Sequence, residues 1–146
     1  MIEVKKLSIG DILRYYNNIE GYIHKYAKVD PVFFNYNSFM SQILKESIDL
    51  FGLYRKDKLV GVLSSFVSCN DNCKPYIDIP VLSGDNILSD KNIISTIEKA
   101  LIDHYSCLAK RPLYLQFNGR LGWIKRLKAV GCHPVHITYN KPIKWL

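Results

Sequence analysis

Residues 50–82, LFGLYRKDKLVGVLSSFVSCNDNCKPYIDIPVL, contain three strand-like segments in succession and decide the fold. The apolar runs 50–54 and 59–63 flank four polar residues, which is typical of a β-hairpin. The second run is predicted to continue to Val67, and a polar turn then leads to a third strand over 75–82. We therefore expect a central run of antiparallel strands.

Pro80 interrupts the third of these strands. Because proline lacks a backbone N–H, it cannot take part in a fully paired ladder. The sequence therefore predicts an edge, a bulge or a splay of the sheet at this residue. Asp78 shares a strand face with Tyr76 and Pro80, whereas apolar residues occupy the other face.

Further helices and strands are predicted on both sides of this centre. Before the centre we expect a strand over 2–7, a helix capped by Ser8 that continues with a break to Tyr26, and a helix from Ser38. After it we expect a helix capped by Ser89, a strand over 112–117, a helix closed by Gly131 and a strand over 134–139. The order β-α-α-β-β-β-α-β-α-β predicts an α/β fold, with an α+β mixed sheet covered by helices. Its length of 146 residues predicts a single domain over residues 1–146.

The composition is that of an ordinary globular protein, with 48% hydrophobic and 23% charged residues. No apolar run reaches the ~20 residues of a membrane span, and the N-terminus lacks the pattern of a signal peptide. We therefore expect a cytoplasmic protein with no membrane association. The net charge of +7 favours acidic partners such as nucleotide cofactors, nucleic acid or acidic proteins. The densest basic cluster, Lys125, Arg126 and Lys128, is interpreted as a solvated helix face, so a nucleic-acid function is not expected.

The four cysteines do not form a metal-binding motif. Cys69 and Cys73 bracket a turn, and histidines lie near the other two, but these groups come from three distant segments and no second C-x-x-C pair is present. Reduced cysteines and no metal are therefore expected, in preference to a tetrahedral zinc site or a Cys69–Cys73 disulfide.

The order of elements, with a central hairpin and a final helix–Gly–strand, resembles the GNAT superfamily of N-acetyltransferases. The segment 123–132, WIKRLKAVGC, is similar to the ending H-I-R-F-L-K-x-I-G-A of a helix in GNAT-like proteins of tailed bacteriophages, some of them internal virion proteins. The resemblance implies a GNAT-like fold and two substrates, an acyl-CoA such as acetyl-CoA and an acceptor amine.

The coenzyme loop of GNAT enzymes, Q/R-x-x-G-x-G/A, holds the CoA pyrophosphate with backbone N–H groups at a helix N-terminus. The corresponding residues 83–92 contain a single glycine, and Asp85 and Asp90 add negative charge. Asp90 is expected to interact with the helix dipole. The resemblance implies coenzyme contacts from the backbone of Val81 and Leu82, and from Gly84, Ser89, Lys91 and, after the next strand, Asn118.

Two residue positions bear on catalysis. GNAT enzymes often carry a carboxylate base on the fourth strand, and the candidate here is Asp78, whose pKa would be raised if its strand face lines a cleft. Many of these enzymes also carry a tyrosine acid four residues before the helix-ending glycine, a position that Leu127 occupies here. Leu127 cannot donate a proton.

Two functions therefore remain open. The first is an acyl-CoA-dependent N-acyltransferase with a degenerate coenzyme motif. The second is a catalytically inactive phage GNAT-like protein that acts as a virion-associated or protein-binding module within a larger assembly. The first would place the chain in the host cytoplasm, and the second in the host cytoplasm or the virion. Calorimetric titration with acetyl-CoA distinguishes the two.

Overall fold

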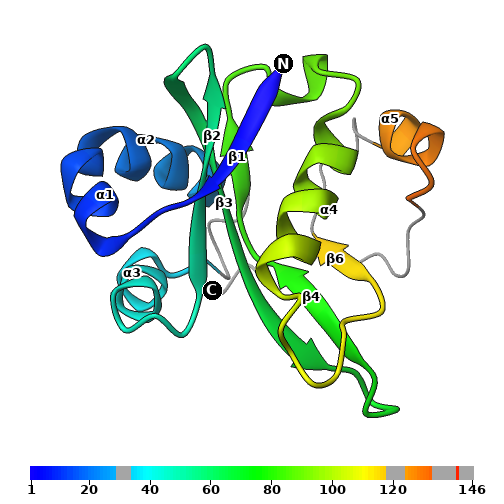
Figure 1. The fold of residues 1–146 in the computed structure, drawn as a ribbon. Helices are drawn as coiled ribbons and strands as arrows, with labels where there is room; N and C mark the ends of the chain where they lie inside the picture. Colours follow the sequence, from blue (N-terminus) through cyan, green and yellow to red (C-terminus); the bar gives the residue numbers. More distant parts are fainter. Residues whose placement is uncertain (29–33, 118–123, 133–140, 142–146) are drawn as a thin grey trace.

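The computed structural model of the protein describes residues 1–28, 34–117, 124–132 and 141. Strands β2 (Asp49–Arg55) and β3 (Lys58–Cys69) form the predicted antiparallel hairpin, and β1 (Ile2–Lys6) pairs antiparallel with β2. The hairpin is longer than its apolar runs suggested. The central antiparallel arrangement is therefore confirmed (Figure 1).

The predicted strand 75–82 is divided in two at Pro80. Its first half, β4 (Pro75–Ile79), pairs antiparallel with β3 and parallel with β6 (Leu115–Phe117). Its second half, β5 (Leu82–Gly84), pairs only with β3 among the described strands. The result is a six-stranded mixed sheet in the order β1-β2-β3-β4-β6, with β5 beside β3.

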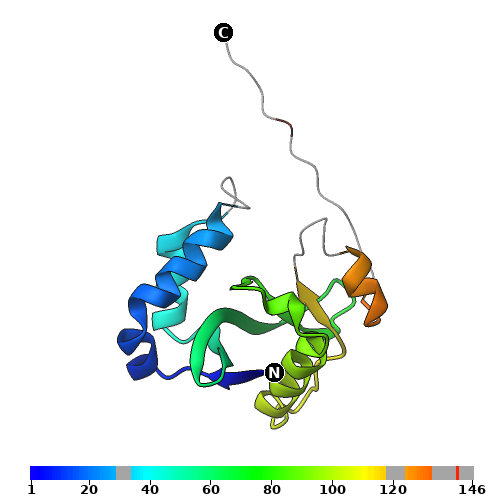
Figure 2. The ribbon, with the colours of Figure 1, turned by 90° about the horizontal axis from the view of Figure 1, so that it is seen from above.

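Helices cover both faces of this sheet. Helices α1 (Ile9–Arg14), α2 (Tyr16–Ala27) and α3 (Tyr36–Leu44) lie on one side, and α4 (Ile93–His104) lies on the other (Figure 2). The short 3-10 helix η1 (Ile87–Ser89) precedes α4, and α5 (Ile124–Ala129) lies beyond α4. The mixed α+β architecture predicted from the sequence is confirmed.

Each side of the sheet has its own hydrophobic core. Strand side chains alternate between the two faces, so β2 and β3 contribute buried residues to both cores. The core under α4 contains Leu63, Ile77, Ile97 and Leu101, and the core under α1–α3 contains Ile19, Ile23, Phe39, Ile43 and Val62. Burial of each such side chain contributes about 1.5–3 kcal/mol to stability, so the two cores hold the sheet from both sides.

Two helix starts differ from the sequence prediction. Ser8 forms the expected cap in a capping box with Asp11, but α3 starts at Tyr36 and is capped by Asn35, which accepts the Ser38 N–H. The prediction that Ser89 caps the long helix is wrong. Ser89 ends η1, and its hydroxyl donates to the Asn86 carbonyl at 2.6 Å, so α4 begins four residues later without a side-chain cap.

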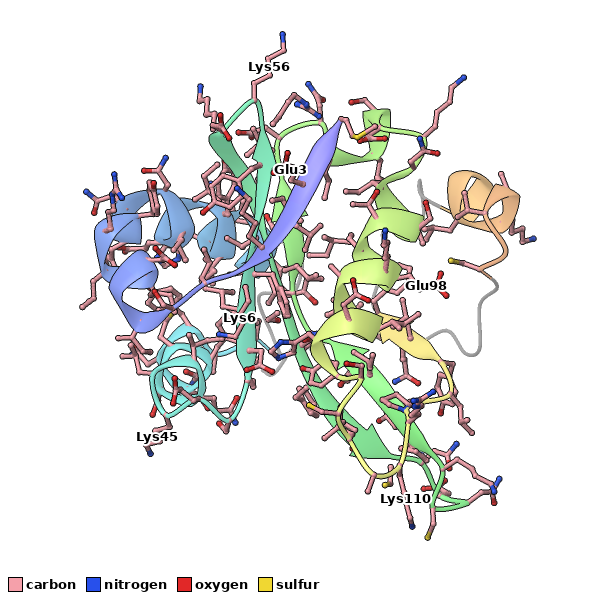
Figure 3. The ribbon with its side chains drawn as sticks, in the orientation of Figure 1. Glu3, Lys6, Lys45, Lys56, Glu98 and Lys110 are labelled. Carbon is pink, nitrogen blue, oxygen red and sulfur yellow. The ribbon has the colours of Figure 1, made fainter. Side chains whose placement is uncertain are left out.

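Several expectations lie outside the described residues, namely the turn at 118–119 and the final strand over 134–139. Within the described ranges, no helix is both long and apolar enough to cross a membrane. Lys56 at the β2–β3 turn, Lys45 after α3 and Lys110 before β6 project from separate parts of the periphery (Figure 3). These positive charges are therefore dispersed over the surface.

Candidate functional site

Strand pairing changes at Pro80, because β4 pairs with both β3 and β6 whereas β5 pairs with β3 alone among the described strands. The two parallel strands are in register from Ile77 opposite Leu115 to Ile79 opposite Phe117, and β5 then continues along β3. Ser64 on β3 stabilises the break. Its buried hydroxyl accepts the Val81 N–H at 3.0 Å, and its own N–H donates to the Val81 carbonyl at 2.9 Å. Both backbone groups of Val81 are thus paired inside the protein.

The backbone of β5 leaves one edge available. Two hydrogen bonds define which backbone groups of this segment point toward β3. The Ser64 N–H donates to the Val81 carbonyl, and the Asp85 N–H donates to the Val60 carbonyl. Because hydrogen-bonded and non-hydrogen-bonded pairs alternate, Leu82 and Gly84 direct their backbone groups to the opposite edge. That edge is where an extended ligand could add backbone-type hydrogen bonds.

Gly84 is required by close packing of β5 on β3. A Cβ placed on it would lie 2.6 Å from the Val60 carbonyl oxygen and 2.9 Å from the Cα of Gly61. Gly61 faces the same restriction from the other strand, where a Cβ would lie 2.6 Å from the Ser83 carbonyl oxygen. Gly84 therefore has a packing role that is independent of any ligand.

Helix α2 holds the loop that follows β5. The Lys25 ammonium donates to the Gly84 carbonyl at 2.9 Å and lies 3.5 Å from the Asp85 carboxylate. The Tyr22 hydroxyl donates to the same carboxylate at 2.9 Å, and burial together with this hydrogen bond raises the pKa of Tyr22 to about 12. Asp85 is thereby drawn toward α2, and a cation stands beside the free edge of β5.

Asp90 serves the structure of the loop, as the sequence indicated. One carboxylate oxygen accepts the Asn92 N–H at 2.9 Å and the other accepts the Ile2 N–H at 2.9 Å. These backbone hydrogen bonds lower the pKa of Asp90 below its usual value. Its charge is therefore partly compensated by N–H groups of the protein itself.

The first turn of α4 keeps backbone donors free. Asn92 at its N-cap makes no side-chain capping bond, and the N–H groups of Ile94 and Ser95 have no acceptor among the described residues. Uncapped N–H groups and the positive end of the helix dipole favour an anion at this position.

A cavity of about 440 Å³ opens directly in front of this helix start. It lies between the segment 88–94 and α5, and it is lined by Leu88, Ser89, Asp90, Lys91, Ile93, Ile94, Leu127, Ala129 and Val130. Ser89 and Lys91 thus line one cavity, and their proposed contacts with a coenzyme stay a prediction. Leu127 adds an apolar wall.

Asp78 lies on the sheet face opposite α4. It is half-buried between Phe66 of β3 and Gln116 of β6 in the strand register. Burial raises the pKa of the Asp78 carboxyl above its usual value, against a smaller effect of the Ile79 N–H. Among the described residues no side chain forms an ion pair or hydrogen bond with this carboxylate, so it is available to a ligand.

The structure thus separates the expected residues into three neighbouring parts. Leu82 and Gly84 form the free edge, Ser89 and Lys91 line the cavity, and Asp78 lies on the face opposite α4, while Asn118 falls outside the described residues.

Sequence reasoning missed Ser64 and Lys25. A signal for Ser64 was present, since Ser64 and Ser65 interrupt an apolar strand and a buried hydroxyl needs a partner. Lys25 gave no such signal, because its contact spans 59 residues of sequence.

The sequence matches no protein-family model, and no curated protein is similar to it. Solved structures are similar over the full length. An aminoglycoside acetyltransferase from an uncultured soil metagenomic sample, in complex with sisomicin, is 15% identical with a TM-score of 0.61 over 98% of this chain and 97% of that chain. Glucosamine-6-phosphate N-acetyltransferase from Arabidopsis thaliana is 12% identical, with a TM-score of 0.61 over 99% of both chains. A second soil metagenomic aminoglycoside acetyltransferase is 10% identical, with a TM-score of 0.64 over 99% of both.

The protein has a GNAT acetyltransferase fold. At these identities the likeness shows the fold alone, and it extends over nearly the whole of both chains. The GNAT fold confirms the architecture expected from the order of elements.

Proposed function

We propose that the protein transfers an acyl group from acyl-CoA, such as acetyl-CoA, to a primary amine. The observation that carries this proposal is the division of one strand at Pro80, because it leaves the outer edge of β5 without a partner strand among the described residues. Further along the chain come an uncapped helix start and a cavity of about 440 Å³. Coenzyme A has three parts that match these features: an extended pantetheine chain for the β5 edge, an anionic pyrophosphate for the helix start and a nucleotide for the cavity.

Each part of such a coenzyme has its own proposed contacts in the protein. The backbone of Leu82 and Gly84 would pair with the pantetheine amides, as a further strand would. The N–H groups of Ile94 and Ser95, which have no acceptor among the described residues, would bind the pyrophosphate, with Lys91 of the cavity wall as a nearby cation. Backbone donors and a lysine replace the glycine-rich pattern that this loop lacks.

Asp78 would act as the general base for the acceptor. The ammonium of the acceptor gives a proton to the Asp78 carboxylate, directly or through a water, and becomes a neutral amine. The amine nitrogen attacks the thioester carbonyl, a C–N bond forms, the C–S bond breaks and the thiolate leaves with the electron pair. The nitrogen, which still carries two protons after the attack, loses one of them to water and becomes the neutral amide. Since Leu127 cannot donate, the thiolate takes its proton from solvent. Positioning of the two substrates supplies most of the acceleration in such a reaction.

Calorimetric titration of the protein with acetyl-CoA tests the coenzyme site. We expect saturable binding that is lost in Ala129→Trp, because the indole would fill the cavity from an exposed position on α5. Ile102→Trp is the matched control, since Ile102 is 55% exposed on α4 and does not line the cavity. Absence of heat with millimolar acetyl-CoA and wild-type protein would contradict the proposal.

A second candidate is a non-catalytic binding module, in a phage particle or another assembly. The observation that favours it is Leu127, an apolar residue on the cavity wall in place of a proton donor. This function predicts a stable complex with another protein and no N-acetylated product when acetyl-CoA and amines are supplied. Detection of product by mass spectrometry, dependent on Asp78, would exclude it as the sole function.

A further inference from the structure

Strand β1 forms one end of the six-stranded sheet (Figure 1). Among the described strands it pairs with β2 alone, so its other edge has no partner strand there. An unpaired edge presents backbone N–H and C=O groups that can pair with a strand of another chain. The residues of β1 therefore decide what this edge can bind.

The hydrogen bonds of β1 show which of its backbone groups point to the free edge. The Leu7 N–H, directly after the strand, donates to the Leu50 carbonyl at 2.9 Å. The register with β2 has no shift, and hydrogen-bonded and non-hydrogen-bonded pairs alternate along an antiparallel ladder. Ile2, Val4 and Lys6 therefore direct their backbone groups away from β2.

A contact at the start of β1 supports this assignment. The Ile2 N–H donates to the Asp90 carboxylate at 2.9 Å, and Asp90 lies outside the sheet. The outward N–H groups of Val4 and Lys6 have no acceptor among the described residues. These two donors are therefore available to a further strand.

The side chains of β1 place one acid and one base on the same face of the strand. Glu3 and Lys5 are both exposed, with 3.5 Å between Oε2 and Nζ. Ile2 and Val4 lie on the other face and pack in the core under α4. Charges on an edge strand commonly oppose pairing with other chains. A charge pattern that is complementary to itself instead favours pairing with a second copy of the same chain.

Pairing of β1 with itself about Val4 matches these charges. In an antiparallel pair with a two-fold axis at Val4, Glu3 lies opposite Lys5 of the second copy, and Lys5 lies opposite Glu3 of the second copy. Opposite charges directly across a strand pair stabilise it, whereas like charges destabilise it. The pairing therefore gains two favourable charge contacts.

The neighbouring registers lack this match. For more than one pair of outward-facing residues to meet, the two-fold axis must lie at Glu3, Val4 or Lys5. An axis at Glu3 places two glutamates opposite each other, and an axis at Lys5 places two lysines opposite each other. The register at Val4 is thus the one that suits both the backbone groups and the charges.

We propose that the protein forms a two-fold homodimer through antiparallel pairing of the free β1 edges, centred on Val4. Val4 exchanges backbone hydrogen bonds with Val4 of the second copy, and the Lys6 N–H donates to the Ile2 carbonyl of the second copy. The Ile2 N–H stays with Asp90. The axis is perpendicular to the sheet, so α4 lies on the same side in both copies. The strand is only five residues long, so the dimer dissociates on dilution.

Exchange of the two charges tests the register. Sedimentation velocity over micromolar to submillimolar protein should show a reversible monomer–dimer equilibrium for the wild type. Glu3→Lys and Lys5→Glu each place like charges opposite one another, so each variant alone should dimerise at least about tenfold more weakly. An equal mixture of the two variants pairs lysines with glutamates and should regain the wild-type affinity within about threefold. A mixture that stays monomeric would overturn the proposal, because each variant can fold alone but only the pair restores the contacts.

Val4→Pro tests the backbone contacts at the same edge. Proline is tolerated in an edge strand where its nitrogen faces away from the neighbouring strand, so the bonds between β1 and β2 remain. The variant lacks the central N–H donor in both copies and should stay monomeric at concentrations where the wild type dimerises, with circular dichroism as the check on folding. The exchange experiment keeps the proposal testable if this variant fails to fold.

Leu44→Lys is the control for association through an exposed apolar side chain. Leu44 is 52% exposed at the end of α3 and should dimerise as the wild type does when replaced. Loss of the dimer in this variant alone would place the interface elsewhere and overturn the proposal, as would a wild type that is monomeric over the whole concentration range. These measurements need no coenzyme or amine, so their outcome is independent of the proposed acyl transfer.

Discussion

The carboxylate of Asp78 is half-buried, an environment that disfavours its negative charge. Burial raises the pKa of its carboxyl, so the ionised form is less favourable in the folded protein than in the unfolded chain. A group of this kind stabilises the fold when protonated and loses that contribution as pH rises through its folded pKa. Its retention as a carboxylate at neutral pH therefore lowers stability, which is consistent with a role in function.

Asp78→Asn tests both sides of this argument. We expect Asp78→Asn to melt at a higher temperature than the wild type at pH 7, and the difference to narrow as pH falls toward the usual Asp value near 4. Acetyl transfer should fall at least about tenfold. The remaining activity should lose the decline at low pH that protonation of the base produces in the wild type. A wild-type melting temperature equal to that of the variant at both pH values would contradict the assignment.

A second polar cluster, formed by Asp49, Ser65, His104 and Tyr105, has a structural role. The Tyr105 hydroxyl donates to the Asp49 carboxylate at 2.9 Å and lies 2.8 Å from the buried Ser65 hydroxyl. His104 also contacts Asp49, with 3.0 Å between Nε2 and Oδ2. These bonds join the C-terminal end of α4 to β2 and β3.

Tyr105→Phe should reduce the free energy of unfolding by about 1–3 kcal/mol, because it leaves the buried Ser65 hydroxyl without its partner. Urea denaturation measures the difference. Tyr16→Phe removes only the exposed 3.2 Å contact with Tyr36 and should stay within about 0.5 kcal/mol of the wild type. Equal losses in the two variants would show that the cluster adds nothing beyond a surface hydrogen bond.

At the scale of elements, β5 depends on two glycines. Gly84→Ala would force a Cβ against the Val60 carbonyl and the Gly61 Cα, and backbone atoms cannot move aside cheaply. We expect a loss of at least about 1–3 kcal/mol in stability and weaker binding of acetyl-CoA, because the free edge would shift.

Gly21→Ala is the matched control. Gly21 lies within α2 with nothing within 4 Å of an added Cβ, so alanine should stabilise the helix by about 0.5–1 kcal/mol. Thermal unfolding of the two variants should therefore move in opposite directions. If Gly84→Ala is as stable as the wild type, the close approach of β3 and β5 is wrong.

The sequence predicted elements well where the signal was local. Alternation located the hairpin, and the missing N–H of Pro80 located the break between β4 and β5. The start of α4 was predicted wrongly because Ser89 is a good cap by type, yet its hydroxyl bonds backward to Asn86. Ser89 could stabilise either η1 or the start of α4. The neighbouring Asp90 is held by the Ile2 N–H, a contact that spans 88 residues and gives no local signal in the sequence.

The candidate site could be predicted only in part. Asp78 and Lys91 were chosen by their positions in the sequence, and a raised pKa of Asp78 was expected only if its strand face lined a cleft. Their roles in a site stay predictions. Two contacts join segments far apart in sequence: the hydrogen bond from Lys25 to the Gly84 carbonyl, and the stacking of Tyr76 on Tyr114. Neither can be inferred from local spacing, because several topologies are compatible with the same strands.

At the scale of the whole molecule, coenzyme binding and folding are linked. The proposed coenzyme contacts come from β5, the α4 start and α5, so unfolded chains lack the site. Acetyl-CoA at about 100 times its dissociation constant should raise the free energy of unfolding by about 2.7 kcal/mol. Differential scanning fluorimetry should show a rise in melting temperature that grows with the logarithm of acetyl-CoA concentration. Ala129→Trp should show none.

Polar side chains fasten the C-terminal end of helix α4 to the sheet. The Asp49–Tyr105 contact fixes its last turn against the sheet, while its first turn offers unpaired N–H groups to the cavity. A ligand that docks there meets a helix whose axis is already set, so little ordering entropy is lost on association. Loosening the distant anchor would therefore weaken affinity by adding motion at the binding end, although no atom that touches the ligand has been changed.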